Sequence, residues 1–396
     1  MIRAQIEKLL AECCQDAVAD GVLAPVPADL IRLEIPKLAA HGDFATNLAM
    51  VAAGREKKKP RPLAEELARR LAQRQDLLAR VEIAGPGFIN LFVAPSVWQG
   101  MVPAVLAAGE SFGLSAAGAG RTVLVEFVSA NPTGPLSVGH GRQAVLGDAI
   151  ARLLAATGHA VTREYYYNDG GRQMRVLGES TRARYLEILG LPHVFPEDGY
   201  QGDYIREIAQ ALKDEHGDRL KDVAAVAPFT AKAEEVIFAD IKGTLARLGI
   251  VFDSFFNEHT LYEDGKLDEV LGALREQGLI YEQEGAVWLR ATSFGLDKDR
   301  VLVKSSGEPT YRLPDIAYHR EKFRRGFDWM VNVFGSDHIA TVPDVLAGVK
   351  ALGFDPAKVT PVIHQFVTLL RDGKQVKMST RKATFVTVDE LLDEVG

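Results

Sequence analysis

Residues 125–148 read VEFVSANPTGPLSVGHGRQAVLGD and predict a strand, a loop and a helix in close succession. The β-branched run at 122–128 predicts a strand, residues 129–136 form a polar loop with prolines and glycines, and an amphipathic helix begins directly after it. In such a unit, unpaired backbone N–H groups and the positive end of the helix dipole both face an anion. We therefore predict a site for nucleotide phosphates at the start of this helix.

The same order of elements continues along the chain. Gly158 is placed to end the helix, and residues 160–167 predict a second strand. A later unit repeats the pattern, with a strand at 329–334, a helix at 336–352 and a strand at 361–369. Repeated β-α-β units predict an α/β fold with a Rossmann-like, doubly wound parallel sheet, whose ligands bind at the carboxyl ends of the strands. The charged, mostly helical stretch at about 168–300 predicts an insertion between the two halves.

A small α/β domain is expected to precede this nucleotide-binding domain, at residues 1–110. Its sequence predicts a helix at 2–20, a second helix opened by Pro62, and two short strands within 81–93. The glycine-rich segment FGLSAAGAG at 112–120 has no periodicity and is typical of a linker. The larger domain is therefore expected at 121–396.

The composition bounds the class of protein. A chain of 396 residues, 47% hydrophobic and 25% charged, is ordinary for a soluble globular protein. The two cysteines, Cys13 and Cys14, are adjacent, so neither a disulfide framework nor a zinc site is expected, and we predict no protein-bound metal. There is no signal sequence and no run of about 20 apolar residues, so we expect a cytoplasmic protein without a membrane anchor.

The net charge of −7 argues against a general polyanion binder but leaves room for a local basic patch. One basic cluster precedes the second helix of the small domain. It consists of Arg55, Lys57, Lys58, Lys59 and Arg61. Taken alone, the cluster is typical of a solvated, lysine-rich loop.

The loop of the opening stretch has the residues that a phosphate site needs. Pro132 and Pro135 stiffen the chain, and Gly134 and Gly139 let a ligand approach the backbone. His140 falls in the first helical turn, where its side chain can donate a hydrogen bond to a phosphate oxygen in a transition state.

Three other features are candidates for function, each with a simpler alternative. Residues 377–381 (KMSTR) form a basic loop after the last strand, where phosphates would lie, although basic loops are usually only solvated. Residues 335–338 (GSDH) end a predicted strand, a position that suits either an adenosine contact or an ordinary helix cap at Ser336 or Asp337. Glu126 lies in an apolar strand, where a buried carboxylate needs either a cationic ligand or an internal salt bridge.

Together these motifs resemble the class I aminoacyl-tRNA synthetases, and among them the arginyl-tRNA synthetases, over essentially the whole chain. SANPTGPLSVGH is similar to the His-x-Gly-His signature, and KMSTR to the Lys-Met-Ser-Lys-Ser loop. Tyr311-x-x-x-Asp315 and Glu126-Phe-x-x-x-Asn131 match the family's arginine-binding elements. The stretches at 41–47 (HGDFATN) and 85–90 (GPGFIN) look like the domain that contacts tRNA.

The resemblance implies ATP-dependent activation of L-arginine and its transfer to the 3′ end of tRNA(Arg), with Mg²⁺ accompanying ATP. His140 and Lys377 would be catalytic. The residues that it assigns to ATP are Pro132, Thr133, Gly134, Ser137, Gly139, His140, Gly335, Asp337, His338, Lys377, Met378 and Ser379. Those that it assigns to arginine are Glu126, Ser129, Asn131, Tyr311 and Asp315. Those that it assigns to tRNA are the basic cluster with Asn47, Phe88 and Asn90, and we expect a monomer.

The sequence departs from the family pattern in three places. Ser137 replaces the first histidine of His-x-Gly-His, and loss of one transition-state donor costs on the order of 10²–10³ in rate. Thr380 replaces the second lysine of the mobile loop, where Arg381 or Lys382 could supply the charge. The resemblance implies a helical anticodon-binding domain after residue 396, and we expect the given sequence to be either a truncated chain or a natural fragment without that domain.

Two alternatives follow from these departures. The first is an impaired relative that binds RNA or arginine, which Ser137, Thr380 and the absent domain favour. The second is a different nucleotidyl transferase, against which the Tyr311/Asp315 and Glu126/Asn131 pairs argue. The family generally needs bound tRNA before it activates arginine, so tRNA must be part of any activity test.

Overall fold

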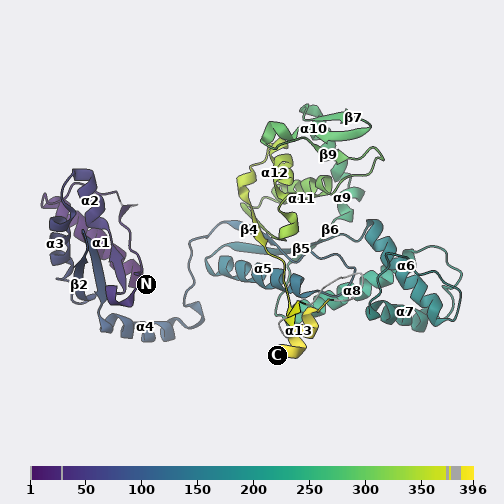
Figure 1. Cartoon of the computed structure of the whole chain (residues 1–396), viewed down its shortest axis with the longest axis horizontal. Helices are drawn as coiled ribbons and strands as arrows, with labels where there is room; N and C mark the ends of the chain where they lie inside the picture. The colour runs from purple at the N-terminus through teal and green to yellow at the C-terminus, as the bar shows by residue number, and fades with distance from the viewer. Residues whose placement is uncertain (1, 28–29, 372–373, 376–384) are drawn as a thin grey trace. The chain divides into compact units, whose positions relative to one another are not determined.

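The computed structural model describes residues 2–27, 30–371, 374–375 and 385–396. Their contacts divide the chain into two compact units, Met1–Gly113 and Leu114–Gly396, each of which is described by itself (Figure 1).

Unit 1 is a small α/β domain with an antiparallel sheet in the order β1-β3-β2. Its elements are α1 (Ile2–Ala19), β1 (Phe44–Thr46), α2 (Leu48–Glu56), α3 (Pro60–Leu71), β2 (Leu78–Ala84), β3 (Phe88–Val93) and α4 (Pro95–Ala108). Ile6 and Leu10 of α1, Leu67 of α3 and Leu91 of β3 lie in one core. Ile89, Leu91 and Val93, which alternate along β3, also lie in this core, and the helices cover the sheet with their apolar faces.

Unit 2 is built on a parallel sheet of five strands, in the order β11-β10-β4-β5-β6. The strands are β4 (Thr122–Glu126), β5 (Ala160–Tyr167), β6 (Ser254–Asn257), β10 (Trp329–Gly335) and β11 (Val359–His364). The chain continues from β4 to β5 on one side, whereas β10 joins β4 on the other. The order therefore reverses between β4 and β10, which is where a doubly wound sheet opens a ligand crevice. The predicted fold class is confirmed.

Helices cover both faces of this sheet, α5 (Val138–Ala156) on one and α11 (Arg312–Arg324) with α12 (Val342–Ala351) on the other (Figure 1). The alternation of β4 explains this arrangement, because Val123 and Val125 pack in the core that includes α5, and Leu124 packs in the one that includes Phe323 of α11. A Cβ at Gly147 of α5 would lie 2.2 Å from the ring of Phe127, so only glycine lets this helix approach the end of β4 so closely.

The interval at 168–300 contains more strands than the mostly helical insertion that the sequence predicts. Its helices are α6 (Gly171–Ile188), α7 (Asp203–His216), α8 (Ala227–Arg247), α9 (His259–Glu263) and α10 (Lys266–Glu276). However, β6 lies in this interval and is an edge strand of the parallel sheet. β7 (Ile280–Gln283), β8 (Ala286–Leu289) and β9 (Arg300–Val303) form a separate antiparallel sheet. These strands have four residues each, too few for a periodic pattern to distinguish them from loops.

The later β-α-β unit is also shorter than predicted. The helix expected at 336–352 is a 3₁₀ turn, η5 (Ser336–His338), followed by α12, because Pro343 opens the regular helix at its first turn. Strand β11 ends at His364 and not at residue 369. The short strands β12 (Leu370–Arg371) and β13 (Lys374–Gln375) then pair with each other.

The last described helix, α13 (Val388–Val395), is fixed to the start of α5. The backbone N–H of Val138 donates to the Val386 carbonyl at 3.1 Å, and that of Val388 donates to the Leu136 carbonyl at 2.8 Å. Asp389 of α13 accepts hydrogen bonds from Thr244 and Arg247 of α8. Backbone hydrogen bonds therefore join Leu136 and Val138, at the start of α5, to the segment that leads into α13.

Candidate active site

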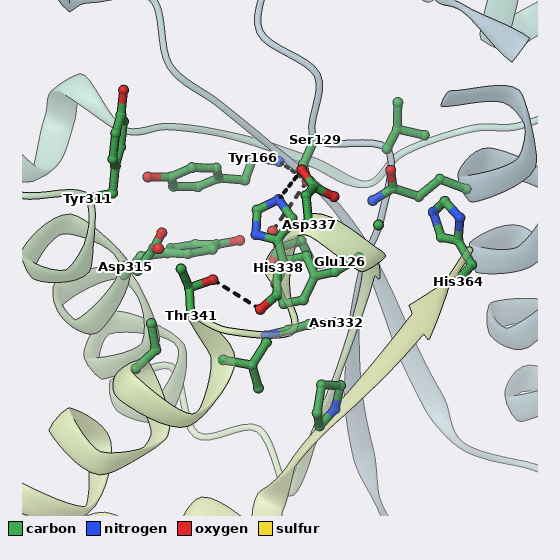
Figure 2. Close-up of a pocket in the computed structure, with 18 of the residues that line it drawn as sticks. Glu126, Ser129, Tyr166, Tyr311, Asp315, Asn332, Asp337, His338, Thr341 and His364 are labelled. Carbon is green, nitrogen blue, oxygen red and sulfur yellow. Dashed lines mark hydrogen bonds and ion pairs between the residues drawn. The ribbon is translucent and has the colours of Figure 1, made fainter. Parts of the chain in front are cut away.

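A cavity of about 570 Å³ opens at the carboxyl ends of β4 and β10, where the strand order reverses (Figure 2). Segments distant in sequence meet in its wall. The lining residues singled out from the sequence are Glu126, Ser129, Asn131, Ser137, Gly139, His140, Tyr311, Asp315, Gly335, Asp337 and His338. The predicted phosphate and arginine elements therefore belong to one cavity.

A strained turn brings strand β4 into this cavity. Val128 and Ser129 have φ values of 66° and 46°, in a region that a β-branched residue rarely adopts. The Ser129 N–H donates to the Phe127 carbonyl at 2.9 Å, which closes the turn. The Ser129 hydroxyl donates to Glu126 Oε1 at 3.2 Å and accepts from the Tyr166 N–H at 3.3 Å. The turn thus points a polar side chain back over the end of its own strand.

The charge of Glu126 is balanced by an internal salt bridge, which is one of the two alternatives that the sequence left open. Lys322 of α11 is fully buried and forms an ion pair with Glu126, and it also donates to Asn332 Oδ1 at 2.9 Å. The Asn332 amide contacts His319 Nε2 at 2.7 Å, and His319 Nδ1 donates to the Asp315 carbonyl at 2.8 Å. A chain of buried polar contacts therefore joins Glu126 to the backbone of Asp315.

One end of the cavity is acidic. The Asp315 side chain has no hydrogen bond or ion pair with any other described residue, and burial raises its pKa to about 7, with further increases from the charges of Glu258 and Glu126 and an opposing effect of Lys322. Burial likewise raises the pKa of Glu258, although its carboxylate accepts from Tyr166 Oη and, at 2.6 Å, from Asn168 Nδ2. Two crowded carboxyl groups with raised pKa values make a binding place for a cation.

The helix N-terminus supplies a hydrogen-bond donor to the cavity. His140 Nδ1 accepts from the Ser137 N–H at 3.2 Å, so the neutral ring carries its proton on Nε2. Burial lowers the pKa of His140, which favours this neutral form. The Ser137 hydroxyl lies 3.3 Å from the same Nδ1. A neutral N–H donor and the start of α5 together form an anion-binding wall.

The end of β10 forms the adjoining wall. The His338 ring stacks on Phe334 with centroids 4.9 Å apart, and His338 Nε2 lies 3.7 Å from an Asp337 carboxylate oxygen. Gly335 is paired in register with His364 of β11. Figure 2 shows His364 on the other side of the view from Asp315 and Tyr311.

Several lining residues were not singled out from the sequence. They are Tyr166, Asn168, Glu258, Asn332 and His364. Each of them follows, ends or lies near the carboxyl end of a parallel strand, and that position is the signal that could have found them. Glu258 was missed because β6 was not recognised as a strand of the sheet.

Other predicted residues lie elsewhere. Pro132, Thr133 and Gly134 do not line the cavity, and the Thr133 carbonyl accepts from Tyr204 Oη of α7 at 2.8 Å. The loop therefore packs against α7 at this point. The predicted phosphate-loop residues are outside the described part of the chain. They are Lys377, Met378, Ser379, Thr380, Arg381 and Lys382.

In unit 1 the basic cluster is exposed and partly paired. Lys58 forms an ion pair with Glu56 at 2.5 Å, and Arg61 donates to the Gly85 carbonyl at 3.2 Å. Arg55, Lys57 and Lys59 are exposed and have no ion pair with a described residue. Phe88, at the start of β3, is 37% exposed.

Asn90, for which a tRNA contact is predicted, is a buried residue of β3. It is 6% exposed, in the middle strand of the unit 1 sheet, where its neighbours are Ala45 and Glu82. A side chain so covered contributes to the domain interior, not to its surface. Asn47, which precedes α2, has a buried Oδ1 without a hydrogen-bond partner among the described residues.

Within the described residues, no group of three or more His, Cys, Asp and Glu side chains is placed to hold a metal ion. The described helices also include none with the length and apolar character needed to cross a bilayer.

Comparison with known proteins agrees with this arrangement. Residues 101–396 match the family model for the catalytic domain of class I tRNA synthetases (R), and residues 3–93 match that of the arginyl tRNA synthetase N terminal domain. The chain is 62% identical to an arginine–tRNA ligase from Desulfotalea psychrophila over 396 residues, covering 100% of this chain and 72% of that protein. It is 52% identical to the one from Salinibacter ruber, covering 100% and 72%.

A solved structure extends the likeness to the fold. The arginyl-tRNA synthetase of Thermus thermophilus superimposes with a TM-score of 0.65 at 23% identity, covering 100% of this chain and 69% of that chain. The two family models together span nearly all of the sequence, which confirms the resemblance drawn from its motifs. The chain therefore belongs to the arginyl-tRNA synthetase family of class I aminoacyl-tRNA synthetases.

Proposed function

We propose that the chain activates L-arginine with ATP and transfers the arginyl group to the 3′ end of tRNA(Arg). The proposal rests on one observation: the same cavity has an acidic end and, elsewhere in its wall, a hydrogen-bond donor at a helix N-terminus. Asp315 and Glu258 form an acidic end, and His140 donates at a helix N-terminus. The first suits a guanidinium group and the second suits phosphate oxygens.

Arginine would place its guanidinium at the acidic end. Asp315 has no partner of its own there, so a cationic ligand would supply the counter-charge that its buried carboxylate lacks. Tyr311 is 84% exposed at the start of α11, where its ring could close over the ligand. Ser129 and Asn131 lie further along the wall, and we assign them to the α-amino group.

ATP would lie along the start of α5 and the end of β10. The arginine carboxylate attacks the α-phosphorus, a carboxylate O–P bond forms, and the bond to the pyrophosphate oxygen breaks. His140 Nε2–H and the backbone at Gly139 would stabilise the developing phosphate charge. Gly335, Asp337 and His338 would contact the nucleoside side, and Lys377, Met378 and Ser379 the pyrophosphate. Mg²⁺ would enter with ATP and share the charge of its phosphates.

Unit 1 would contact tRNA through exposed basic and aromatic groups. Arg55, Lys57 and Lys59 have no competing ion pair with a described residue, and Phe88 is partly exposed. Contacts of this kind are made to phosphates, so tRNA affinity should fall steeply with salt. We propose that the protein is a monomer and that it acts in the cytoplasm.

Arginine-dependent exchange of pyrophosphate into ATP, with and without tRNA(Arg), tests the proposal. We expect exchange that requires tRNA and is lost in Asp315→Asn, whereas Asp268→Asn, an exposed carboxylate on α10, should behave as the wild type. No exchange in either condition, with arginine still bound, would support the impaired relative to which Ser137 points. Exchange supported equally by another amino acid would contradict the assignment.

A further inference from the structure

His364 is the last residue of β11 and lines the same cavity, at a position that no motif of the sequence singles out. Its Nε2 atom is buried and has no hydrogen-bond partner among the described residues. Buried polar atoms in native proteins are nearly always paired, so an unpaired one in the wall of a ligand cavity indicates a partner that the ligand brings.

The hydrogen bond on the other side of the ring fixes what Nε2 can do. His364 Nδ1 lies 3.1 Å from the Gln365 carbonyl oxygen. A carbonyl oxygen can only accept, so Nδ1 carries the proton in the neutral ring and Nε2 has only a lone pair. This is the reverse of His140, whose Nδ1 accepts and whose Nε2 donates. The cavity therefore contains one histidine that donates and one that accepts.

The surrounding contacts hold the ring in place at the nucleotide side of the cavity. The Gln365 carbonyl also accepts from Arg142 Nη1 at 3.2 Å, and Arg142 lies on α5, two residues after His140. His364 is paired in register with Gly335 at the end of β10. The end of β11 is thus tied both to the helix that faces the phosphates and to the strand assigned to the nucleoside.

The identity of the partner follows by elimination. Phosphate oxygens are acceptors and gain nothing from a second acceptor. The guanidinium and the α-amino group of arginine are donors, but the guanidinium belongs at the acidic end, which Figure 2 shows on the other side of the view. The α-amino group is assigned to Ser129 and Asn131. The remaining donors in the substrates that would fill this wall are the 6-amino group of adenine and the ribose hydroxyls.

We propose that His364 Nε2 accepts a hydrogen bond from the nucleoside part of ATP, either the adenine 6-amino group or a ribose hydroxyl. His364 is then a binding residue for ATP, held by the bond of its Nδ1 to Gln365. The inference rests on the proposed function, since it requires ATP in this cavity.

Direct binding of ATP to the unmodified chain, measured by titration calorimetry, tests it without relying on turnover. His364→Phe keeps a ring and removes the acceptor, and His364→Gln restores an acceptor at similar reach. His193→Phe is the matched control, because His193 Nδ1 also lies 3.1 Å from a backbone carbonyl but its side chain is exposed, outside the cavity. We expect His364→Phe to weaken ATP binding about three- to tenfold, as loss of one neutral hydrogen bond does, and His364→Gln to recover part of it.

Three analogues identify the donor. Purine riboside triphosphate lacks the 6-amino group, and 2′-deoxy-ATP and 3′-deoxy-ATP each lack one hydroxyl. The analogue without the contact group should bind equally to wild type and His364→Phe, whereas the others should keep the full difference. His193→Phe should bind all ligands as the wild type does.

Each contrary result overturns a distinct claim. Unchanged ATP affinity in His364→Phe, at an unchanged melting temperature, would overturn the inference alone. The same would follow from an equal loss for ATP and all three analogues, because the ring would then act only by packing. Failure of the wild type to bind ATP at all would overturn the proposed nucleotide site together with the inference.

Discussion

Asp315 has a buried carboxyl group whose surroundings disfavour its ionised form. It faces the cavity near Glu258 and Glu126, and its pKa of about 7 stands far above its ordinary value of 3.8. The unfolded chain ionises this carboxyl at lower pH than the folded chain does, so Asp315 takes stability away as pH rises from about 4 to 7. Binding of a cation needs the ionised form. Function and stability are therefore opposed at this residue.

Asp315→Asn should separate the two effects. We expect the variant to raise the melting temperature at pH 8 and to change it much less at pH 4, where the folded carboxyl is neutral and the unfolded one is only about half ionised. Its kcat/KM for arginine should fall by about 10²-fold or more, because the remaining site loses a buried charge partner. In the wild type, kcat/KM should fall as pH drops below about 7. A variant that melts at lower temperature at pH 8 would contradict this account.

Removing the charge of Lys322 should destabilise the protein, because this charge is already paired with Glu126. Lys322→Met leaves Glu126 buried without its counter-ion, and we expect a loss of about 3–5 kcal/mol in the free energy of unfolding, measured with urea. The double variant Glu126→Gln, Lys322→Met should recover most of that loss, because neither charge is then buried alone. A single variant within about 1 kcal/mol of wild type would show that the ion pair is not what stabilises this region.

Ser137 should limit kcat of the wild-type enzyme, because it supplies no second donor to the phosphates. Its backbone already orients His140, but its hydroxyl lies near Nδ1 and not on the donor side of that ring. A histidine at this position could add a second donor to the phosphate wall. We expect Ser137→His to raise kcat for pyrophosphate exchange, by up to about 10²-fold, with little change in KM for arginine. An unchanged kcat would mean that the serine or its neighbours already compensate.

At the scale of the elements, strand ends and one docked helix shape the site. The left-handed turn at Val128 and Ser129 ends β4 inside the cavity, and the pairing of residues 386 and 388 with 138 and 136 holds the start of α5. Helix α13 is in turn bonded to α8 through Asp389. The position of His140 therefore depends on a helix that never enters the cavity.

Asp389→Ala should expose that dependence. Asp389 binds both Thr244 and Arg247, whereas Asp393 of the same helix binds only Arg247 and is 72% exposed. We expect Asp389→Ala to lower kcat several-fold, by about 1 kcal/mol of lost positioning, and Asp393→Ala to have almost no effect. Steady-state exchange kinetics on the two variants measure the difference. Equal effects would mean that α13 acts only through the charge of Arg247.

At the scale of the whole molecule, local patterns predicted the sheet and long-range contacts made the site. Strand 160–167 has the predicted bounds, because its run of β-branched and aromatic residues is clear and Gly158 marks its start. The partner of Glu126 could not be read from the sequence, since Lys322 is 196 residues away on a helix with other charged residues. Glu258 could not be predicted as a cavity residue either, because only the pairing of β6 with β5 brings it to the cavity.

Formation of arginyl-tRNA, measured with labelled arginine and a tRNA(Arg) transcript, tests the proposed function directly. We predict that arginine is esterified, that the uncharged isostere citrulline is not, and that His140→Ala reduces the rate by about 10²–10³-fold. Charging of citrulline at a comparable rate would contradict the acidic end as the selector of arginine. A wild-type rate in His140→Ala would contradict the phosphate site at the start of α5.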